Sequence, residues 1–286
     1  MSSKTAVEII RQSAETLKQA GIADAHHDAR ALMKMALSTG DPSSLPLAMR
    51  LISDDQIQVF EALIARRATR EPLQHILGQA AIFELTVKSD RRALVPRQDS
   101  AELIALAFLC MSRRHADSFV MADLGTGSGV LLAECLHHFR NARGIAVERD
   151  PDALALAAEN FENLALTPRT QIFAGSWRDW PDWGGCELII SNPPYIKSDV
   201  IATLQPEVRD HDPQAALDGG ADGLDAYREI IDLAGSQMRS GALLIFEIGF
   251  DQNQAVSALL LDAGFTDLRH QQDMGGNDRA IAATKS

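Results

Sequence analysis

Closely spaced cysteines are missing from this sequence. It contains only Cys110, Cys135 and Cys186, which lie far apart and form no CxxC pair. Zinc sites and disulfide frameworks both need cysteines at short, regular spacing. Histidine offers no substitute, because the pairs at 26–27 and 137–138 lack the i, i+4 spacing of helical metal ligands. We therefore expect three reduced cysteines and no bound metal.

Long hydrophobic runs are also missing. No stretch approaches the roughly 20 apolar residues that a membrane-spanning helix needs. The opening residues, MSSKTAVEIIRQSAETLKQAG, mix charged and apolar side chains and build no signal-peptide core. We expect a cytoplasmic protein with no membrane partner.

Basic residues are outnumbered. The chain has 27 Lys and Arg against 39 Asp and Glu, a formal net charge of −12. Binding to a phosphate backbone depends on basic residues that displace counterions, so stable binding to free nucleic acid is not expected.

With 286 residues and 46% hydrophobic content, the chain can form one large domain or two. We expect a monomer.

Residues 1–75 are predicted to form a small helical domain. Apolar residues recur every three to four positions from Val7 to Leu17, before Gly21, which indicates an amphipathic helix. A second helix is expected over about 24–37. The capping-box spacing of Ser53 and Gln56 opens a third, which continues to about residue 70.

Residues 76–98 are expected to form a β-hairpin linker. Phe83, Leu85 and Val87 alternate at period two, the segment KSDRR (88–92) turns, and ALV (93–95) returns.

Residues 99–286 alternate between apolar runs and helical stretches, which predicts an α/β domain with a mostly parallel sheet. The predicted strands are FVMADL, GIAVE, TQIFAG, ELIISN and ALLIFEIG.

A glycine-rich turn, DLGTGSG (123–129), joins the first of these strands to a helix. Glycines at 125, 127 and 129 let a ligand approach the backbone, and Glu148 follows Gly129 by 19 residues, where such folds place an acid on ribose hydroxyls. Such a turn can also arise by chance, but the acid makes that less plausible. A dinucleotide needs GxGxxG, whereas GxGxG after Asp123 better suits S-adenosylmethionine, which carries no phosphate.

The segment LIISNPPYI (188–196) raises a second question. Three apolar residues predict a buried strand, and the two prolines, which cannot donate to a ladder, must end it at Asn192. Asn-Pro pairs also mark ordinary turns, so the four letters alone leave a plain strand exit equally open.

Together, DLGTGSG, Glu148 and NPPY make the chain resemble class I S-adenosylmethionine-dependent methyltransferases that methylate a nitrogen on a planar, conjugated group. More specifically, it resembles the protein-(glutamine-N5) methyltransferases of the HemK/PrmC type. This likeness is carried by REPLQHILGQAAIFELTV, ALVPRQDSAEL, DPQAALDGGADGLDAYREII, GALLIFEIGFDQ and NDRAI, and covers most of residues 66–286.

The resemblance implies a Rossmann-like methyltransferase sheet over 99–286 and a substrate-recognition role for the helical domain. It implies methylation of the side-chain amide of the glutamine in the GGQ motif of peptide chain release factors, with S-adenosylhomocysteine as product. It also implies cofactor contacts at Gly125, Thr126, Gly127, Ser128, Gly129, Glu148, Trp177 and Asn192. The substrate glutamine is implied to lie against Asn192, Pro193, Pro194 and Tyr195, of which Asn192, Pro193 and Tyr195 are catalytic.

Some positions differ from the family pattern. PRPETE is PRQDSA here, Ser176 stands where an Asp usually precedes Trp177, and His75 stands where Tyr is usual. Glu247, at the end of an apolar strand, is either a buried hydrogen-bonded acid or a residue that lines the site; we expect the structural role.

Two other functions stay open. A nucleic-acid base or a ribosomal-protein glutamine is an alternative substrate, and a basic face would favour the base. The chain could also bind the cofactor without catalysing methyl transfer. The presence of Asn192 and Tyr195 argues against this, because a protein that only binds the cofactor does not need residues that hold the substrate nitrogen. The basic face would consist of Arg66, Arg67, Arg70, Arg91, Arg92 and Arg97.

Overall fold

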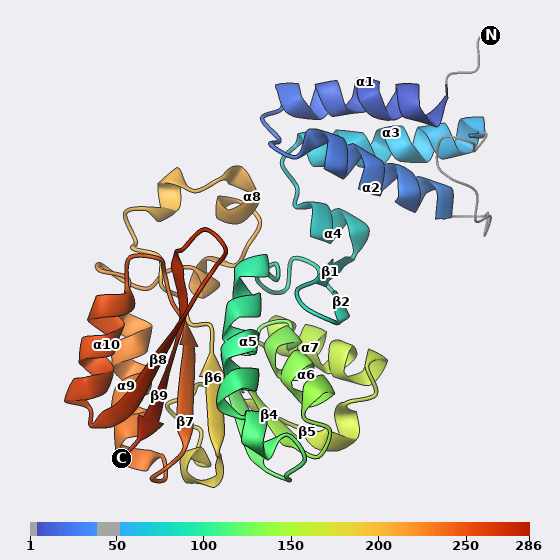
Figure 1. Cartoon of the computed structure of the whole chain (residues 1–286). Coiled ribbons are helices and arrows are strands. Elements are labelled where there is room, and N and C mark those ends of the chain that lie inside the picture. The colour runs from blue at the N-terminus through green and yellow to red at the C-terminus, as the bar shows by residue number, and fades with distance from the viewer. Residues whose placement is uncertain (1–4, 39–51) are drawn as a thin grey trace. The chain divides into compact units, whose positions relative to one another are not determined.

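A computed structural model describes residues 5–38 and 52–286 (Figure 1). The chain forms two compact units. A helical unit contains the N-terminal residues up to Gly78 together with Gln205–His211, and an α/β unit contains Gln79–Leu204 and Asp212–Ser286. In the part of the chain that the structure covers, no helix is both long and apolar enough to cross a membrane.

The helical unit is built from α1 (Ala6–Gln19), α2 (Ala25–Ser38), α3 (Asp54–Ala68), the short α4 (Leu73–Leu77) and α8 (Pro206–Arg209) (Figure 1). The three long helices confirm the predicted ones. Ser53 and Gln56 form the predicted capping box of α3, and Thr5 with Glu8 forms another on α1. The helices bury one apolar core, in which Leu17, Leu32 and Phe60 are fully enclosed.

A buried ion-pair cluster holds α8 in this unit. The Arg67 guanidinium contacts the Asp28 carboxylate at 2.8 Å and the Glu207 carboxylate at 3.0 Å, and Arg70 contacts Glu207 at 2.5 Å. The Arg67 and Asp28 side chains are 8% and 7% exposed. Burial raises the pKa of Glu207, but hydrogen bonds from Arg70 and Arg67 outweigh it and hold the pKa below its usual range.

The linker differs from its prediction. A hairpin is present, but its strands are β1 (Gln79–Ala81) and β2 (Thr86–Lys88), so Phe83 and Leu85 lie in the connection. The predicted return strand ALV is absent from the assigned strands of the described chain. The Asp90 carboxylate accepts bonds from the Arg92 backbone and guanidinium, which folds the segment locally, and the Val95 N–H donates to Asp212 at 3.0 Å instead of to a strand.

The α/β unit contains a seven-stranded sheet of order β5-β4-β3-β6-β7-β9-β8. The five predicted strands are confirmed as β3 (Val120–Leu124), β4 (Arg143–Glu148), β5 (Thr170–Ala174), β6 (Leu188–Ser191) and β7 (Leu243–Glu247), and all pair in parallel.

The antiparallel edge of the sheet was not anticipated. β9 (Asp278–Lys285) pairs with β7, and β8 (Phe265–Gln272) pairs with β9. The Gly275-Gly276 dipeptide between the two strands is a hairpin signal that would have located this turn.

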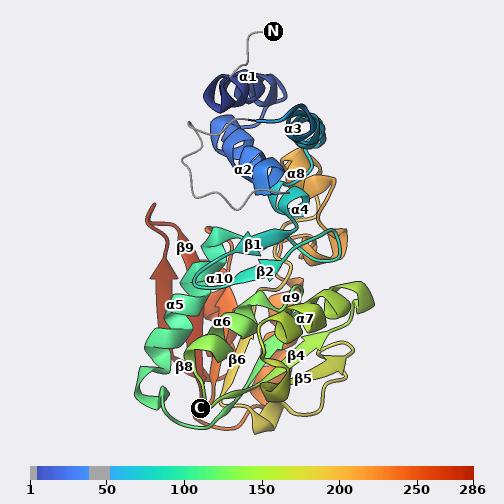
Figure 2. The ribbon, with the colours of Figure 1, turned by 90° about the vertical axis from the view of Figure 1, so that its right-hand side faces the viewer.

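Helices cover both faces of the sheet (Figures 1 and 2). On one face lie α5 (Ala101–Cys110), α6 (Val130–His138) and α7 (Pro151–Asn163), and on the other α9 (Asp225–Gln237) and α10 (Asn253–Asp262). All three cysteines are free, with Cys135 and Cys186 in the two buried layers.

We predict that Arg67→Ala destabilises the helical unit by about 3–5 kcal/mol, because it removes the cation that pairs with the buried Asp28 carboxylate, while Glu207 keeps Arg70. The neighbouring Arg66→Ala is the matched control. Arg66 is half exposed and, among the described residues, forms an ion pair with Glu71 alone, so its loss should cost less than about 1 kcal/mol. Hydrogen exchange of α2 and α3 in the full chain measures both, and equal protection in the two variants would contradict the cluster's role.

Candidate active site

The site lies at the carboxyl ends of β3 and β6. Leu124 of β3 pairs with Ser191 of β6, so Gly125 and Asn192 leave adjacent strands at the same level. The Ser191 hydroxyl donates to the Leu124 carbonyl at 2.7 Å, which ties the two strand ends together. The strand order changes direction here, and open α/β sheets bind ligands at such a point.

The glycine turn is held against β4. The backbone N–H groups of Gly125 and Thr126 both donate to the Val147 carbonyl, at 2.9 and 3.1 Å. Gly125 and Gly127 have φ of 71° and 56°, in the left-handed region that side chains avoid. The turn therefore exposes backbone to a ligand in a conformation that glycine best supports.

Glu148 ends β4 and supports the same turn. Its carboxylate accepts from the Gly127 N–H and from the Asp150 N–H, both at 3.0 Å. A carboxylate has about four acceptor positions, so two bonds leave capacity for hydroxyl donors of a ligand. The acid predicted to contact ribose thus also fixes the turn, which the spacing alone did not indicate.

Asp123, which opens the motif, is a buried acid directly beneath the glycine turn that sequence reasoning left out of the site. It is fully buried, one carboxyl oxygen accepts from the Thr126 hydroxyl at 2.6 Å, and the other has no hydrogen-bond partner within residues 5–38 and 52–286. Burial raises its pKa to about 7, against the Thr126 bond, which lowers it. The clue in the sequence was an acid at the end of an otherwise apolar strand.

Gly129 occupies a different place from the other turn glycines. It precedes α6 in the left-handed conformation, and a Cβ there would lie 2.7 Å from the Phe161 ring and 3.2 Å from Ala157. It is not among the residues that line the pocket. Its position indicates close packing of the turn on α7.

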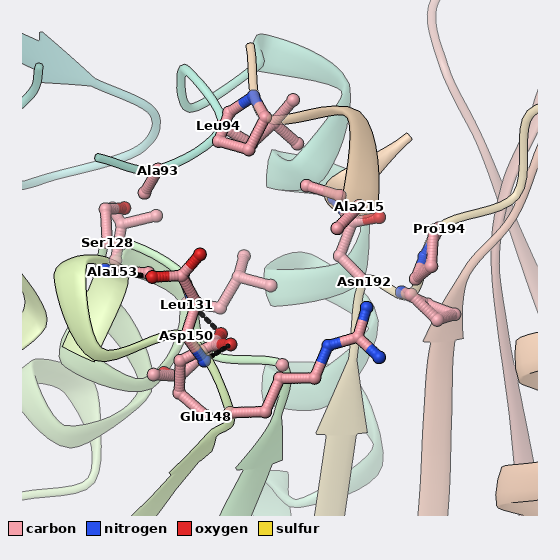
Figure 3. A pocket seen from close by; sticks show the side chains of 18 of the residues that line it. Ala93, Leu94, Ser128, Leu131, Glu148, Asp150, Ala153, Asn192, Pro194 and Ala215 are labelled. Atoms are coloured by element: carbon pink, nitrogen blue, oxygen red, sulfur yellow. Dashed lines mark hydrogen bonds between the residues drawn. The ribbon is translucent and has the colours of Figure 1, made fainter. Parts of the chain in front are cut away.

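A pocket of about 1050 Å³, including its open mouth, lies beside the turn. Figure 3 shows Glu148 and Asp150 on one side and Asn192 and Pro194 on the other. Of the residues predicted for the site, those that line the pocket are Gly125, Thr126, Gly127, Ser128, Glu148, Trp177, Asn192, Pro193 and Pro194.

Trp177 and Ser176 form part of the wall. The Trp177 indole N–H donates to Glu229 at 2.7 Å, which orients the ring, and Arg178 pairs with the same carboxylate. The Ser176 hydroxyl accepts from the Arg178 N–H at 3.2 Å. Serine at this position therefore caps the local turn.

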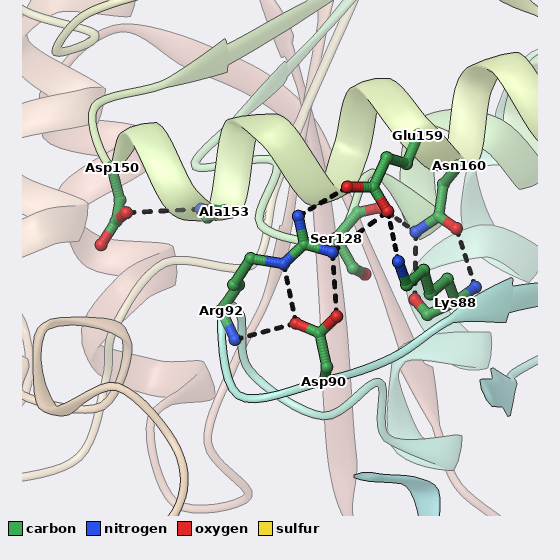
Figure 4. Close-up of polar contacts among 8 residues, drawn as sticks. All are labelled: Lys88, Asp90, Arg92, Ser128, Asp150, Ala153, Glu159 and Asn160. Carbon is green, nitrogen blue, oxygen red and sulfur yellow. Dashed lines mark hydrogen bonds and ion pairs between the residues drawn. The ribbon is translucent and has the colours of Figure 1, made fainter. Parts of the chain in front are cut away.

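The hairpin is tied to the glycine turn by Asn160 of α7 (Figure 4). Its amide exchanges two hydrogen bonds with the Lys88 backbone, at 2.7 and 3.1 Å, and donates to the Ser128 carbonyl at 2.9 Å. Nearby, the Arg92 guanidinium lies between the carboxylates of Asp90 and Glu159. The pocket wall from β2 to Leu94 is thus fastened to α7.

Acceptors of the NPPY segment meet no donor among the residues that the structure describes. The Asn192 amide nitrogen donates weakly to the Ser100 hydroxyl at 3.5 Å. Within the described residues, no donor reaches the Asn192 side-chain oxygen or the Pro193 carbonyl. The same holds for the Pro194 carbonyl, whereas the carbonyl of Tyr195 accepts from the Gln252 amide at 3.0 Å.

Tyr195 is not among the residues that line the pocket. The Tyr195 side chain is half-buried and packs against the core on the α9 side of the sheet. Its hydroxyl donates a hydrogen bond to the Glu247 carboxylate at 3.1 Å. Contact of Tyr195 with a ligand therefore stays a prediction.

The loop DGGADG lies against the NPPY backbone. The Ile196 N–H donates to the Leu217 carbonyl at 2.9 Å and the Gly219 N–H to the Ile196 carbonyl at 2.8 Å. A Cβ on Gly219 would lie 2.8 Å from the Pro194 oxygen and from the Tyr195 Cα. Only a residue without a side chain allows this approach.

Two other motifs meet at the pocket through Asp212. Its carboxylate accepts from the Val95 N–H and pairs with the Arg97 guanidinium at 2.5 Å, while its side chain is fully buried. PRQDS and DPQAALDGG, about 115 residues apart, are thereby joined at the Asp212 carboxylate. Both contribute to the pocket lining, through Arg97, Ser100, Pro213 and Ala215 among others.

The fold and this site define a class I methyltransferase. A structural relative, the hMettl16 catalytic domain in complex with MAT2A 3'UTR hairpin 6, has a TM-score of 0.59 at 15% identity and covers 78% of this chain and 82% of its own. That likeness concerns the fold alone.

Sequence comparisons define the particular family. Residues 8–78 match the family described as PrmC N-terminal domain, and residues 104–206 match the methyltransferase small domain. A release factor glutamine methyltransferase of Caulobacter vibrioides is 37% identical over 99% of this chain and 97% of its own length, and that of Agrobacterium fabrum is 37% identical over 93% and 92%. The chain belongs to the release factor glutamine methyltransferase family.

The cofactor of this family is S-adenosylmethionine, and the pocket fits it. The backbone of the glycine turn, which lines the pocket, and the spare acceptor capacity of Glu148 suit a ligand with ammonium and hydroxyl donors. Arg92 and Arg97 line the pocket, but both pair with carboxylates of the protein, so they are poorly placed to hold a pyrophosphate.

We predict that Gly219→Ala lowers the free energy of unfolding by about 1–3 kcal/mol, because the added methyl group meets NPPY backbone atoms that must move. Gly185→Ala is the control, since nothing lies within 4 Å of its Cβ position and its φ is not positive. It should change stability by less than about 0.5 kcal/mol in denaturant unfolding. Equal effects of both substitutions would show that the close approach is unimportant.

Proposed function

We propose that this enzyme transfers a methyl group from S-adenosylmethionine to the side-chain N5 amide of a glutamine in a peptide chain release factor, within the GGQ motif. The observation that carries the proposal is a pair of acceptors beside the cofactor pocket, the Asn192 side-chain oxygen and the Pro193 carbonyl, which no donor of the described residues reaches. The named substrate of the family relatives supports the same choice.

An amide nitrogen is a poor nucleophile, because its lone pair is delocalised into the carbonyl group. S-adenosylmethionine, when bound, supplies an electrophilic methyl group. The Asn192 oxygen and the Pro193 carbonyl accept one N–H bond each and turn the nitrogen lone pair out of conjugation toward the cofactor pocket. The two prolines hold these acceptors rigid, so that the contribution is orientation and fixed dipoles.

The remaining site residues act before the transfer. Glu148 binds ribose hydroxyls with its spare acceptor capacity, the backbone at Gly125–Ser128 receives the amino-acid end, and Trp177 covers an apolar part of the cofactor. Pro194 and Tyr195 pack on the flat face of the substrate glutamine. The glycine turn, which binds the cofactor, and the NPPY segment, which binds the amide, thus follow the ends of two neighbouring strands.

The charge distribution disfavours a nucleic-acid base as substrate. Five of the six arginines that would form a basic face have carboxylate partners within their own unit. Arg66 pairs with Glu71, Arg67 and Arg70 with Glu207, Arg92 with Asp90, and Arg97 with Asp212. Paired guanidinium groups attract phosphates less strongly, so stable nucleic-acid binding is not proposed.

The helical unit is proposed to recognise the release factor. One glutamine offers few atoms, so efficient binding needs contacts far from the reacting nitrogen. This unit lacks the glycine turn and the NPPY segment, and it has exposed apolar residues such as Val7 and Val59. Because release factors act in translation, the proposal places the enzyme in the cytoplasm, where a monomer suffices.

Competition between substrate classes tests the proposed function. The full-length protein with labelled S-adenosylmethionine is offered a release factor, a ribosomal-protein mixture, and RNA or DNA in parallel. We expect label only in the release factor. Transfer to nucleic acid, or to ribosomal protein in preference, would overturn the proposal.

We predict that Asn192→Ala reduces the single-turnover rate of methyl transfer by roughly 10²–10³, the scale for losing one preorganised catalytic dipole. Asn141→Ala is the control and should retain the rate, because Asn141 is exposed and its side chain donates to the Ala116 carbonyl, outside the pocket. A loss of less than about threefold in Asn192→Ala would contradict the proposal that the Asn192 oxygen accepts a hydrogen bond from the substrate amide.

We predict that Glu148→Ala weakens cofactor binding by about 1.5–3 kcal/mol, since charge-assisted bonds to two hydroxyls are lost. Part of the loss will come from the glycine turn, because Gly127 also loses its acceptor. Calorimetry measures the affinity, with the exposed Glu162→Ala of α7 as control. Unchanged affinity in Glu148→Ala would remove the ribose contact.

A further inference from the structure

Glu247 is a buried acid whose position has no role in the site as described so far. It is the last residue of β7, only 2% exposed, and one of its carboxyl oxygens accepts from the Tyr195 hydroxyl at 3.1 Å. The other oxygen is buried and makes no hydrogen bond of normal geometry to the described residues. Burying such a group without a partner disfavours folding, so its retention at this position calls for an explanation.

The surroundings fix the direction of the Tyr195 bond. Burial, and then the charge of Glu247, raise the pKa of Tyr195 far above its usual value, so the phenol keeps its proton and donates it. Burial also raises the pKa of Glu247 to about 7, against the hydroxyls of Ser100 and Tyr195, which lower it. Asp99 raises this pKa and Arg279 lowers it, and both face the same acid.

Ser100 connects this acid to Asn192. Its side chain is nearly fully buried, and its oxygen accepts from the Asn192 amide nitrogen at 3.5 Å. A hydroxyl has one proton and two lone pairs, so an O–H directed at Glu247 presents its lone pairs to Asn192. The Asn192 nitrogen is then directed to Ser100, and its oxygen is left for the pocket.

The backbone of Tyr195 is held from the same strand end. The Gln252 amide donates to the Tyr195 carbonyl at 3.0 Å and accepts from the Gly249 N–H at 3.0 Å. The Tyr227 hydroxyl donates to the Glu247 carbonyl at 2.8 Å. Tyr195 is thus fixed at its hydroxyl and at its carbonyl, and both anchors follow from the motif that ends β7.

We propose that Glu247 acts through Ser100 and the Tyr195 hydroxyl as a positioning residue, which orients the Asn192 amide oxygen and the Tyr195 ring for methyl transfer. The inference rests on the function proposed above, because it assigns Asn192 the acceptor role. Glu247 itself does not line the pocket and is not proposed to touch substrate.

The test compares two buried acids with the same substitution. Glu247→Gln keeps the shape but replaces one of the two carboxyl oxygens with an NH2 group, which can face Tyr195 or Ser100. We expect kcat to fall roughly ten- to hundredfold. The cofactor Kd and the KM for release factor should stay within about twofold.

Glu134→Gln is the matched control. Glu134 is 1% exposed and accepts from the backbone of Phe83, Glu84 and Leu85, outside the pocket lining. Its substitution should lower Tm and leave kcat of the folded enzyme within about threefold of the wild type. Equal losses of kcat in the two variants would show a merely structural effect and overturn the proposal.

Ser100→Ala and the double variant Ser100→Ala/Glu247→Gln complete the test. Residues that act as one unit are non-additive, so the double variant should be no slower than the slower single variant. Multiplicative losses would overturn the connection through Ser100.

Asn192→Ala, assayed in parallel, separates the two levels of inference. If Asn192→Ala loses activity but Glu247→Gln keeps it, the positioning role is wrong and the proposed function stands. If Asn192→Ala is fully active, Asn192 does not bind the substrate amide, and the proposed positioning role of Glu247 is wrong as well.

Discussion

The parallel pairing of β3 with β6 is the constraint on which the site depends. The register sets Leu124 beside Ser191, so the glycine turn and the NPPY segment begin on neighbouring strands, which lie about 4.8 Å apart in any sheet. Side chains of a fully buried strand cannot themselves form a site, because both faces are covered. The chemistry is therefore confined to the residues that follow the strand ends.

Acidic residues at the carboxyl ends of the buried strands hold the loops that form the site. Asp123 of β3, Glu148 of β4 and Glu247 of β7 each end or nearly end a strand, and each bonds a residue of a neighbouring loop. Asp123 and Glu247 are buried deeply enough to raise their pKa values to about 7. Such positions weaken a core, and proteins retain them mainly where function needs the geometry.

The sequence predicted the fold best where periodicity was strong. The five parallel strands and the capping box of Ser53 and Gln56 followed from local pattern, because burial on both faces and helix-end hydrogen bonds leave a direct imprint. Phe83 and Val95 were misplaced in a hairpin, because distant partners decide their backbone bonds: Glu134 binds the Phe83 N–H and Asp212 the Val95 N–H. No pattern within a short window contains such partners.

The residues of the site were likewise predictable only where a local motif identified them. Motif spacing and family resemblance identified Glu148 and Asn192, but not the second function of Glu148 in holding Gly127. Gly129 looked like a ligand contact, and its close approach to Phe161 could be found only in three dimensions. Of the two roles that the sequence allowed for Glu247, the structural one was expected. In the fold it is buried and also bonded to Tyr195, so the two readings are compatible.

The most direct measurement of the central claim is tandem mass spectrometry of a release factor after reaction with this enzyme and methyl-labelled S-adenosylmethionine. The account predicts a single labelled methyl group on the side-chain nitrogen of one glutamine. Label on a carboxylate, a lysine or another side chain would contradict it, because the Asn192 and Pro193 acceptors are arranged to bind the two N–H groups of a primary amide.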